Sequence, residues 1–368
     1  MRLKIIHLTQ FLGVGGLEKV LFHLINEQIQ AGHEVELVVY DYEQSWVEYF
    51  RSSGIKVDTS YRKRNGYDLN LIKFLSNKIK KFDILHTHDL NPLMYASPLK
   101  LGHQITNKKF PKLIHTAHGM DHLNKRPITK LYEKICSYSV DKTIGVSSAI
   151  CDYYLSLGVS KEKLLNINNG TNLTKYPEQS IHATKEKVRR ELGLNKEIII
   201  WSCVARIVPL KDQQIICSLA KKLPKHIFLL IGPSGNNEYW DRIEKTKPDN
   251  VLMLGAREDI SELLLSSDYF ISASRHEGIP ISVLEAGALK IPCLLSDIPG
   301  HKLIQSKAIQ SVGIYFEVGN LEDLIEKAIA LSNDKNLSRT LGLSLYQNVR
   351  ENFSSNAMYN QYQEAYLN

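Results

Sequence analysis

Two glutamates separated by seven residues carry the clearest chemistry of this sequence. Glu277 precedes a Gly-Ile-Pro turn, and Glu285 falls in the first turn of the helical pattern that follows. A carboxylate placed after an apolar strand and before a helix faces the edge of a parallel sheet where ligands bind. We therefore predict that Glu277 contacts a ligand. For Glu285, the Ser282-x-x-Glu285 spacing also fits a helix capping box, so a structural role stays open.

Two cations follow another apolar run. Arg206 and Lys211 stand five positions apart in the loop after residues 197–204. Arginine offers a planar fork of N–H donors and lysine a mobile point charge, so together they suit one pyrophosphate. For this pair alone, solvated loop charges are the simpler interpretation.

A glycine-rich turn, Gly13-Val-Gly15-Gly16-Leu-Glu18, joins the first expected strand to the first helix. Glycines let a backbone approach a ligand closely, and a helix N-terminus offers unpaired N–H groups to an anion. Glu18 stands where a dinucleotide fingerprint needs its third glycine, so a dehydrogenase is the weakest interpretation. The turn predicts a phosphate or sugar loop, with a plain tight turn as the alternative.

Four histidines gather at the ends of two neighbouring expected strands: His86, His88, His115 and His118. A zinc site usually adds a cysteine or carboxylate at a recognisable spacing, and the sequence offers none here. We therefore predict no metal, and structural or acceptor-lining roles for His86, His88 and His115.

These residues stand in a repeated alternation of short apolar runs and helical patterns. Strands are expected at 3–8, 35–40, 84–87, 113–117, 143–146, 197–204, 227–231, 251–254, 269–272 and 292–296. Apolar strands separated by helices are typical of parallel sheets covered on both faces. The Asn-rich stretch 166–175 interrupts the alternation and predicts a hinge between two Rossmann-like halves.

Composition narrows the class of protein. The 368 residues are 43% hydrophobic and 23% charged, which excludes wholesale disorder, coiled coil and collagen. Five scattered cysteines without a CxxC pair argue for a reducing compartment and against disulfides or a zinc ribbon. No apolar run reaches the roughly 18–20 residues of a membrane span, and the first residues are expected to form a strand and not a signal peptide.

The net charge of +7 is unevenly distributed. Residues 1–175 carry 24 Lys and Arg against 16 Asp and Glu, whereas the remaining residues carry 22 against 23. A basic first half suits an anionic partner such as nucleic acid, an acidic membrane or a phosphorylated ligand, although solvated lysines explain the same excess.

Taken in order, the motifs resemble the GT-B-fold glycosyltransferases of family 4, which are retaining, nucleotide-sugar-dependent enzymes. The resemblance spans nearly the whole chain and rests on Gly15-Gly16-x-Glu18, His118-Gly119, Asn168-Asn169-Gly170-Thr-Asn172, Arg206 with Lys211, Gly255-x-Arg257-Glu-Asp259, Glu277-x7-Glu285 and Ser296-Asp297-x-x-Gly300. Two segments depart from the family pattern: Gly232-Pro-Ser-Gly235 and the bulky Tyr315-Phe316.

The resemblance implies an α/β GT-B fold, in which two Rossmann-like domains face each other across a cleft. Residues 1–170 would form the acceptor-binding domain, 171–345 the nucleotide-sugar donor domain, and 346–368 a helix that crosses back to the first domain.

The resemblance also implies roles for individual residues. The catalytic ones are His118 at the reaction centre, Glu277 at the donor sugar, and Arg206 with Lys211 at the donor pyrophosphate. The other donor-binding residues are Gly15 and Gly16 over the diphosphate, Gly255 and Arg257 by the nucleobase, the backbone N–H groups of Gly278, Ile279, Pro280 and Ile281 at the sugar and phosphate, and Glu285 at the ribose.

The expected function is transfer of a sugar from a UDP- or GDP-sugar to a lipid-linked or cell-surface polysaccharide precursor, such as a lipopolysaccharide or capsule precursor. No cofactor or metal is expected, and no nucleic acid partner. We expect a cytoplasmic protein whose basic first half contacts the anionic inner face of the plasma membrane. The basic clusters are Arg62-Lys63-Arg64, Lys78-Ile-Lys80-Lys81 and Lys108-Lys109-x-x-Lys112.

Three other functions stay open: a GT-B-fold sugar-nucleotide epimerase, a transferase acting on a small-molecule acceptor, and a non-catalytic scaffold. The intact spacing of Glu277 and Glu285 favours transfer over the epimerase, in keeping with the family pattern. Intact Arg206 and Lys211 argue against a scaffold that has lost its site.

Overall fold

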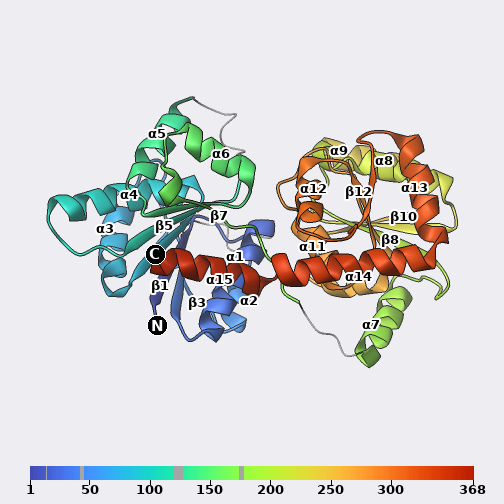
Figure 1. The fold of residues 1–368 in the computed structure, drawn as a ribbon, viewed down its shortest axis with the longest axis horizontal. Helices are drawn as coiled ribbons and strands as arrows, with labels where there is room; N and C mark the ends of the chain where they lie inside the picture. The colour runs from blue at the N-terminus through green and yellow to red at the C-terminus, as the bar shows by residue number, and fades with distance from the viewer. Residues whose placement is uncertain (14, 42–44, 120–126, 174–177) are drawn as a thin grey trace. The chain divides into compact units, whose positions relative to one another are not determined.

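The computed structural model describes residues 1–13, 15–41, 45–119, 127–173 and 178–368, which form two compact units (Figure 1). The first unit contains Met1–Gly170 and Ser355–Asn368, and the second contains Thr171–Ser354. The chain crosses between them twice, and the backbone N–H of Thr171 donates to the carbonyl of Phe353 at 2.9 Å beside these crossings. The first crossing lies within the expected hinge, whose Thr174 and Lys175 are outside the described residues.

The first unit is built on a seven-stranded parallel sheet of order β3-β2-β1-β4-β5-β6-β7. Its strands are β1 (Lys4–Thr9), β2 (Glu34–Val39), β3 (Lys56–Asp58), β4 (Ile84–His88), β5 (Lys112–Ala117), β6 (Lys142–Gly145) and β7 (Leu164–Asn166). Its helices are α1 (Gly16–Gln30), α2 (Val47–Ser52), α3 (Leu69–Lys78), α4 (Leu90–Ile105), α5 (Pro127–Tyr138), α6 (Ser148–Ser156) and α15 (Ser355–Leu367), with short 3-10 turns η1 (Ile79–Lys81) and η2 (Lys161–Lys163).

The second unit is built on a six-stranded parallel sheet of order β10-β9-β8-β11-β12-β13. Its strands are β8 (Ile199–Val204), β9 (His226–Ile231), β10 (Val251–Gly255), β11 (Tyr269–Ser272), β12 (Cys293–Ser296) and β13 (Ile314–Phe316). Its helices are α7 (Glu178–Glu191), α8 (Gln213–Lys222), α9 (Asn237–Thr246), α10 (Ile260–Ser266), α11 (Ile281–Ala288), α12 (Pro299–Ser306), α13 (Leu321–Asn333) and α14 (Lys335–Asn352), with the 3-10 turn η3 (Pro209–Lys211).

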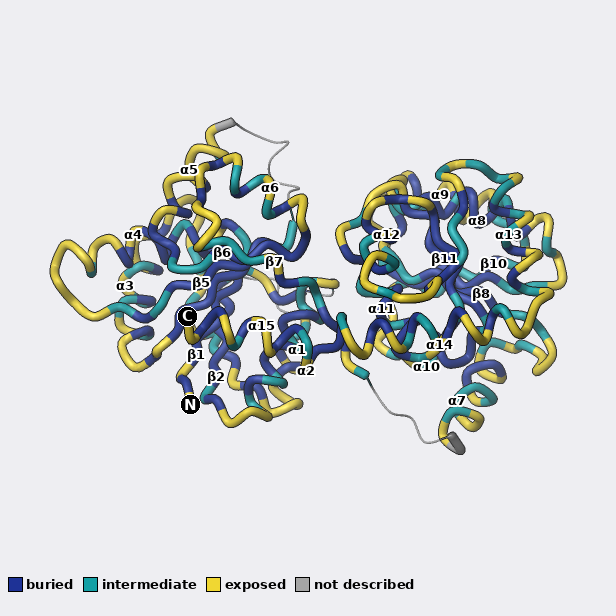
Figure 2. The backbone as a smooth tube through the Cα atoms, in the orientation of Figure 1, coloured by how far each residue is buried: buried dark blue, intermediate teal, exposed yellow. Residues whose placement is uncertain are grey.

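Helices cover both faces of the second sheet. One core packs α8, α9 and α13 against Trp201 and Phe228, and the other packs α10, α11 and α14 against Ile200 and Phe270. Neighbouring positions of one strand therefore face different cores, which is why these strands are apolar throughout. The strands of both sheets are buried, whereas the outward faces of the helices are exposed (Figure 2). The predicted α/β fold of two parallel sheets is confirmed.

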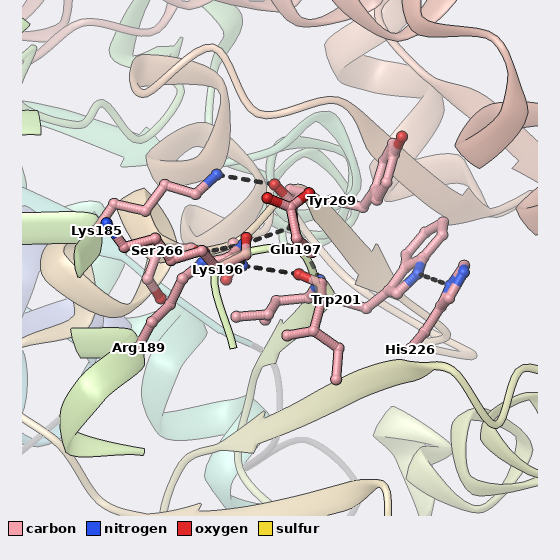
Figure 3. Close-up of polar contacts among 12 residues, drawn as sticks. Lys185, Arg189, Lys196, Glu197, Trp201, His226, Ser266 and Tyr269 are labelled. Carbon is pink, nitrogen blue, oxygen red and sulfur yellow. Dashed lines mark hydrogen bonds and ion pairs between the residues drawn. The ribbon is translucent and has the colours of Figure 1, made fainter. Parts of the chain in front are cut away.

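A polar cluster around the buried Arg189 holds α7 against the amino edge of the second sheet (Figure 3). Arg189 Nη2 and Lys185 Nζ each lie 2.8 Å from a carboxylate oxygen of Asp268, which also accepts from the backbone N–H of Ile200 at 3.0 Å. Arg189 also donates to the carbonyl of Ser266. This cluster joins strand beginnings and lies at the edge opposite to the candidate site, so its role is structural.

The C-terminal helical stretch is divided differently from the prediction. α14 spans the expected boundary at residue 345, because Leu345 and Val349 pack tightly on Gly287 of α11. Only Ser355–Asn368 return to the first unit, as α15. Among the described residues, every helix is too short or too polar to cross a bilayer.

Candidate active site

Both sheets contain a point where the strand order reverses. In the first unit it lies between β1 and β4, and in the second between β8 and β11. Loops leave the sheet in opposite directions on the two sides of such a point, and the crevice at the carboxyl ends of the strands is where open α/β sheets bind ligands. We therefore describe where the predicted site residues of each unit lie relative to the reversal point of its sheet.

In the second unit, Lys211 and Glu277 meet at the reversal point. Lys211 ends η3 after β8, Glu277 lies in the loop after β11, and Lys211 Nζ is 2.5 Å from Glu277 Oε1. Ser274 Oγ donates to the same carboxylate oxygen at 2.7 Å. Each side chain of the ion pair is 15% exposed, so the pair is partly desolvated and still accessible. The structure thus brings the side chain predicted to bind phosphate, Lys211, into contact with the side chain predicted to bind the sugar, Glu277.

A second ion pair fixes the two loops that carry Lys211 and Glu277. Asp212 accepts from Arg275 Nε at 3.0 Å and Nη2 at 2.7 Å, and the backbone N–H of Arg275 donates to the carbonyl of Leu210 at 2.9 Å. Asp212 adopts a left-handed conformation with φ of 48°, which is strained for a residue with a side chain. Sequence reasoning missed Asp212 and Arg275, although Asp212 directly follows a predicted site residue.

Arg206 is exposed and lies in a loop that packs on the loop after β9. The backbone N–H of Ile207 donates to the carbonyl of Pro233 at 2.9 Å, and that of Gly235 to Ile207 at 3.2 Å. A Cβ atom on Gly232 would lie 2.1 Å from the carbonyl oxygen of Ala205. Gly232 and Gly235, which depart from the family spacing, therefore shape the loop that presents Arg206.

Gly255 and Arg257 lie at the end of β10, two strands away from β8. Gly255 adopts a positive φ of 66° and its carbonyl accepts from the backbone N–H of Gly232 at 2.8 Å. Arg257 makes a two-pronged ion pair with Asp259, at 2.7 Å from Nε and 2.6 Å from Nη2. This ion pair of Arg257 is therefore local to its own turn and does not involve Lys211 or Glu277.

The segment between Glu277 and α11 is only partly available to a ligand. Gly278 is exposed, Ile279 and Pro280 are buried, and α11 begins at Ile281 with Pro280 as its N-cap residue. Because proline has no backbone N–H, the expected donor at position 280 is wrong. The capping-box role considered for Glu285 is also wrong, because Ser282 lies inside the helix and is not its N-cap residue. Glu285 is half-buried, and its contact with the ribose stays a prediction.

The N-terminus of α12 packs against the loop that carries Glu277 and Gly278. A Cβ atom on Gly300 would lie 2.3 Å from the carbonyl oxygen of Gly278 and 2.5 Å from that of Glu277. The following residue, His301, is fully buried, and its Nδ1 donates to the carbonyl of Ser296 at 2.7 Å. Its Nε2 is buried and has no partner in the described part of the chain, and burial lowers the pKa of the ring. Sequence reasoning missed His301, which directly follows the Ser-Asp-x-x-Gly motif.

Replacing Gly300 with alanine is expected to lower the free energy of unfolding by about 1–3 kcal/mol, because the added methyl overlaps backbone atoms that cannot rotate away. The matched control is Gly278→Ala, because an added Cβ there meets no atom within 4 Å. Calorimetric unfolding of both variants measures the difference. Equal thermal stability of the two variants would contradict the close packing of α12 on the Glu277 loop.

In the first unit, the chain's own carboxylate occupies the glycine turn. Gly15 is extended, with φ of −165°, and precedes α1, while Glu18 Oε1 accepts from the backbone N–H of Gly13 at 3.2 Å. A Cβ atom on Gly15 would lie 2.6 Å from Glu18 Oε2. Gly16 is exposed. A phosphate at this helix N-terminus therefore competes with Glu18, and Val14 lies outside the described residues.

The predicted histidines surround the reversal point of the first sheet. His118 follows β5, and its backbone N–H donates to Asp89 Oδ1 at 2.9 Å. His86 and His88 are fully or almost fully buried on β4 and are joined by His7 of β1, which sequence reasoning missed. Burial lowers the pKa of His7 and His118 to about 4, so these rings are neutral at physiological pH.

Three of these rings place nitrogens within 4.8 Å of one another, a spacing that a metal ion requires: His7, His86 and His88. All six of their ring nitrogens, however, lie 2.8–3.0 Å from hydrogen-bond partners of the protein. A metal needs free lone pairs, so it would have to break this network. The cluster therefore suits a hydrogen-bonded core better than a metal centre. His115 also bonds within the protein, to the hydroxyls of Thr87 and Tyr154.

Comparison with known proteins agrees with this fold. Residues 14–175 match the family described as Glycosyltransferase Family 4, and residues 184–352 match Glycosyl transferases group 1. The chain therefore belongs to the GT-B glycosyltransferases of family 4 and group 1, and it is a transferase enzyme.

Particular relatives support this assignment. The chain is 26% identical, over 73% of its length and 71% of the relative's, to the Escherichia coli UDP-Gal:alpha-D-GlcNAc-diphosphoundecaprenol alpha-1,3-galactosyltransferase. It is 24% identical, over its whole length and 97% of the relative's, to N-acetyl-alpha-D-glucosaminyl L-malate synthase of Bacillus anthracis. The crystal structure of Anabaena HepE in complex with UDP and glucose has the same fold, with a TM-score of 0.83, 17% identity and 99% of both chains covered.

Proposed function

We propose that this glycosyltransferase moves a hexose from a UDP- or GDP-sugar to a lipid-linked polysaccharide precursor, with retention of the anomeric configuration. The observation that carries the donor part is the Lys211–Glu277 pair at the reversal point of the second sheet. A cation and a carboxylate at one place suit a ligand that has both an anionic diphosphate and a hydroxyl-rich sugar. The E. coli relative is named for a UDP-Gal donor and a diphosphoundecaprenol acceptor, which supports this choice.

The chemistry of the proposed reaction follows from these charges. As the bond between the sugar and the diphosphate breaks, negative charge grows on the leaving phosphate. Lys211 and Arg206 offset that charge, and Glu277 accepts hydrogen bonds from the sugar. Each preformed charge of this kind commonly lowers the barrier by about 3–4 kcal/mol. We propose that the two cations do this without a metal ion, and that His118 contacts a hydroxyl of the bound sugar.

We also propose that the first unit contacts an anionic membrane through α5. Five large side chains of this helix are 49–58% exposed: Ile128, Leu131, Tyr132, Ile135 and Tyr138. The backbone of α5 is mostly in the exposed colour in Figure 2. The helix's one carboxylate, Glu133, is buried and accepts from the hydroxyls of Tyr153 and Tyr154 at 2.8 and 2.6 Å, whereas Lys130 and Lys134 are exposed. An apolar stripe with lysines beside it suits an anionic bilayer surface.

Two of the basic residues expected at the membrane are used inside the protein. Lys78 pairs with Glu36 at 2.5 Å and also with Asp58, and Lys112 donates to the carbonyls of Ala365 and Tyr366 at the end of α15. These two lysines are therefore removed from the proposed membrane surface. Exposed residues of the same clusters remain as candidates: Arg62, Arg64, Lys80, Lys81, Lys108 and Lys109.

Replacing Leu131 and Ile135 together with glutamate is expected to abolish sedimentation with vesicles of anionic phospholipid at low salt, because charge enters the apolar stripe of α5. Leu343→Glu is the matched control, since this leucine is 44% exposed on α14 of the second unit. Vesicle binding that survives the double substitution would contradict the role of α5.

Transfer itself is tested with purified enzyme, a panel of UDP- and GDP-sugars, and a diphosphoundecaprenol-linked sugar as acceptor. The proposal predicts acceptor-dependent release of nucleoside diphosphate and an equatorial anomeric proton, the mark of an α-linkage, in the product NMR spectrum when the donor is an α-hexoside. Turnover of a nucleotide sugar without any acceptor would favour the epimerase. Transfer to L-malate alone would favour a small-molecule acceptor, as in the name of the B. anthracis relative.

A further inference from the structure

A chain of hydrogen bonds joins His118 to a buried glutamine of α1. His118 Nε2 lies 3.0 Å from His88 Nδ1, and His88 Nε2 lies 2.9 Å from His7 Nδ1. His7 Nε2 then lies 2.8 Å from Gln28 Oε1. His7, His88 and Gln28 are at most 2% exposed, so water does not compete for these bonds.

A second branch of the network provides a partner for the other end of the Gln28 amide. Gln28 Nε2 donates to the hydroxyl of Tyr366 at 2.9 Å, which α15 brings back from the end of the chain. The Tyr366 hydroxyl lies 2.8 Å from His86 Nδ1 and is able to donate to it, because it already accepts from Gln28. His86 Nε2 in turn lies 2.8 Å from Thr116 Oγ1. Hydroxyls and neutral imidazoles both donate and accept, so this branch is complementary with the amide in either orientation. The two orientations differ at His118 Nδ1, which has no partner among the described residues and would become a buried N–H without an acceptor if the amide were reversed. Buried N–H groups without a partner are rarer in proteins than unpartnered acceptors, which favours the orientation given above.

The orientation of this amide decides where the proton sits on each ring. An amide oxygen only accepts, so His7 carries its proton on Nε2 and presents the lone pair of Nδ1. His88 must then donate from Nε2 to His7, and His118 must donate from Nε2 to His88. His118 Nδ1 is left as a lone pair, and this buried atom has no partner among the described residues. Each ring is neutral because of its burial, so each has a single proton to place.

We propose that Gln28 and Tyr366 are positioning residues that hold His118 in its Nε2–H tautomer, so that Nδ1 accepts a hydrogen bond from a hydroxyl of the bound sugar. Reversing the Gln28 amide would reverse every bond of the chain and give His118 an Nδ1–H donor instead. The identity of the ligand rests on the proposed function, whereas the tautomer is a property of the free enzyme.

A matched pair of substitutions on α15 tests the proposal. Tyr366→Phe removes the acceptor of the Gln28 amide N–H, so that the reversed amide, which donates to His7 instead, becomes favoured. Tyr362→Phe also removes one buried hydroxyl, but this one lies 3.2 Å from Thr116 Oγ1, at the far end of the branch. Gln28→Met removes the acceptor of His7 directly. The readout is the ring nitrogen spectrum of the full chain labelled with 15N-histidine, in which His118→Asn identifies the signals of His118.

The proposal predicts a single Nε2–H pattern for His118 in the wild-type enzyme and in Tyr362→Phe. In Tyr366→Phe and Gln28→Met, an Nδ1–H population appears and kcat falls by about ten- to hundredfold, the effect of one unsatisfied buried hydrogen-bonding group, while the donor KM stays within about threefold. An Nδ1–H proton on His118 in the wild type, or identical spectra for Tyr366→Phe and Tyr362→Phe, overturns the proposal. Absence of transfer by the wild-type enzyme would overturn the proposed function instead, because the spectra require no substrate.

Discussion

Replacing Lys211 with methionine is expected to lower kcat/KM for transfer by about 10²–10³-fold, because a charge that stabilises the leaving diphosphate is lost. Methionine keeps the unbranched stem, so the packing of η3 is retained. The substitution also leaves the carboxylate of Glu277, which is 15% exposed, without the ammonium group that lies 2.5 Å from it. Initial rates of nucleoside diphosphate release at varied donor concentration measure the effect.

The matched control for this substitution is Lys222→Met, because Lys222 is exposed at the opposite end of α8. It is expected to leave kcat/KM unchanged. The kcat/KM of Lys211→Arg is expected to lie between the values of these two variants, since arginine keeps the positive charge but replaces a compact ammonium group by a planar guanidinium group. Wild-type kcat/KM in Lys211→Met would show that the leaving group is stabilised elsewhere.

Replacing Glu277 with glutamine is expected to lower kcat by about 10²–10³-fold and to tighten the binding of nucleoside diphosphate. The two effects have opposite signs for one reason. In the free enzyme the carboxylate neutralises Lys211, so its removal leaves the ammonium free to bind phosphate more strongly. The same removal takes away the acceptor for the sugar hydroxyls. Steady-state rates and titration calorimetry with UDP and GDP measure the two effects separately.

The control for this substitution is Glu326→Gln, which removes an exposed carboxylate of α13. It is expected to leave both quantities unchanged. If Glu277→Gln instead loses diphosphate binding together with turnover, then Glu277 acts by holding Lys211 in place and does not serve the sugar directly.

The nearness of Lys211 and Glu277 was partly predictable from the sequence. Both follow apolar runs that read as parallel strands, and the carboxyl ends of parallel strands share one edge of the sheet. The order of the strands was not predictable, because it depends on which helices pack against each other across the whole unit. The adjacency of β8 and β11, which brings these two loops together, is therefore a finding of the structure.

Other features of the site cannot be predicted from the local sequence. Asp89 and Asp212 adopt positive φ values of 64° and 48°, and both lie where loops leave the two sheets towards the candidate site residues. Only tertiary contacts hold aspartate in such conformations, so propensity does not predict them. His7 similarly reads as one residue of an apolar strand. Its part in the histidine network depends on the neighbouring β4 and on Gln28 of α1.

Binding of nucleoside diphosphate to the second unit's charges is the central claim of this account, and titration calorimetry of the full chain tests it most directly. Wild-type enzyme is expected to bind UDP or GDP, and the double variant Arg206→Ala, Lys211→Met to bind it at least about 100-fold more weakly, as for loss of two charge-assisted contacts. Unchanged affinity in the double variant, or no binding of either diphosphate by the wild type, would contradict the donor site.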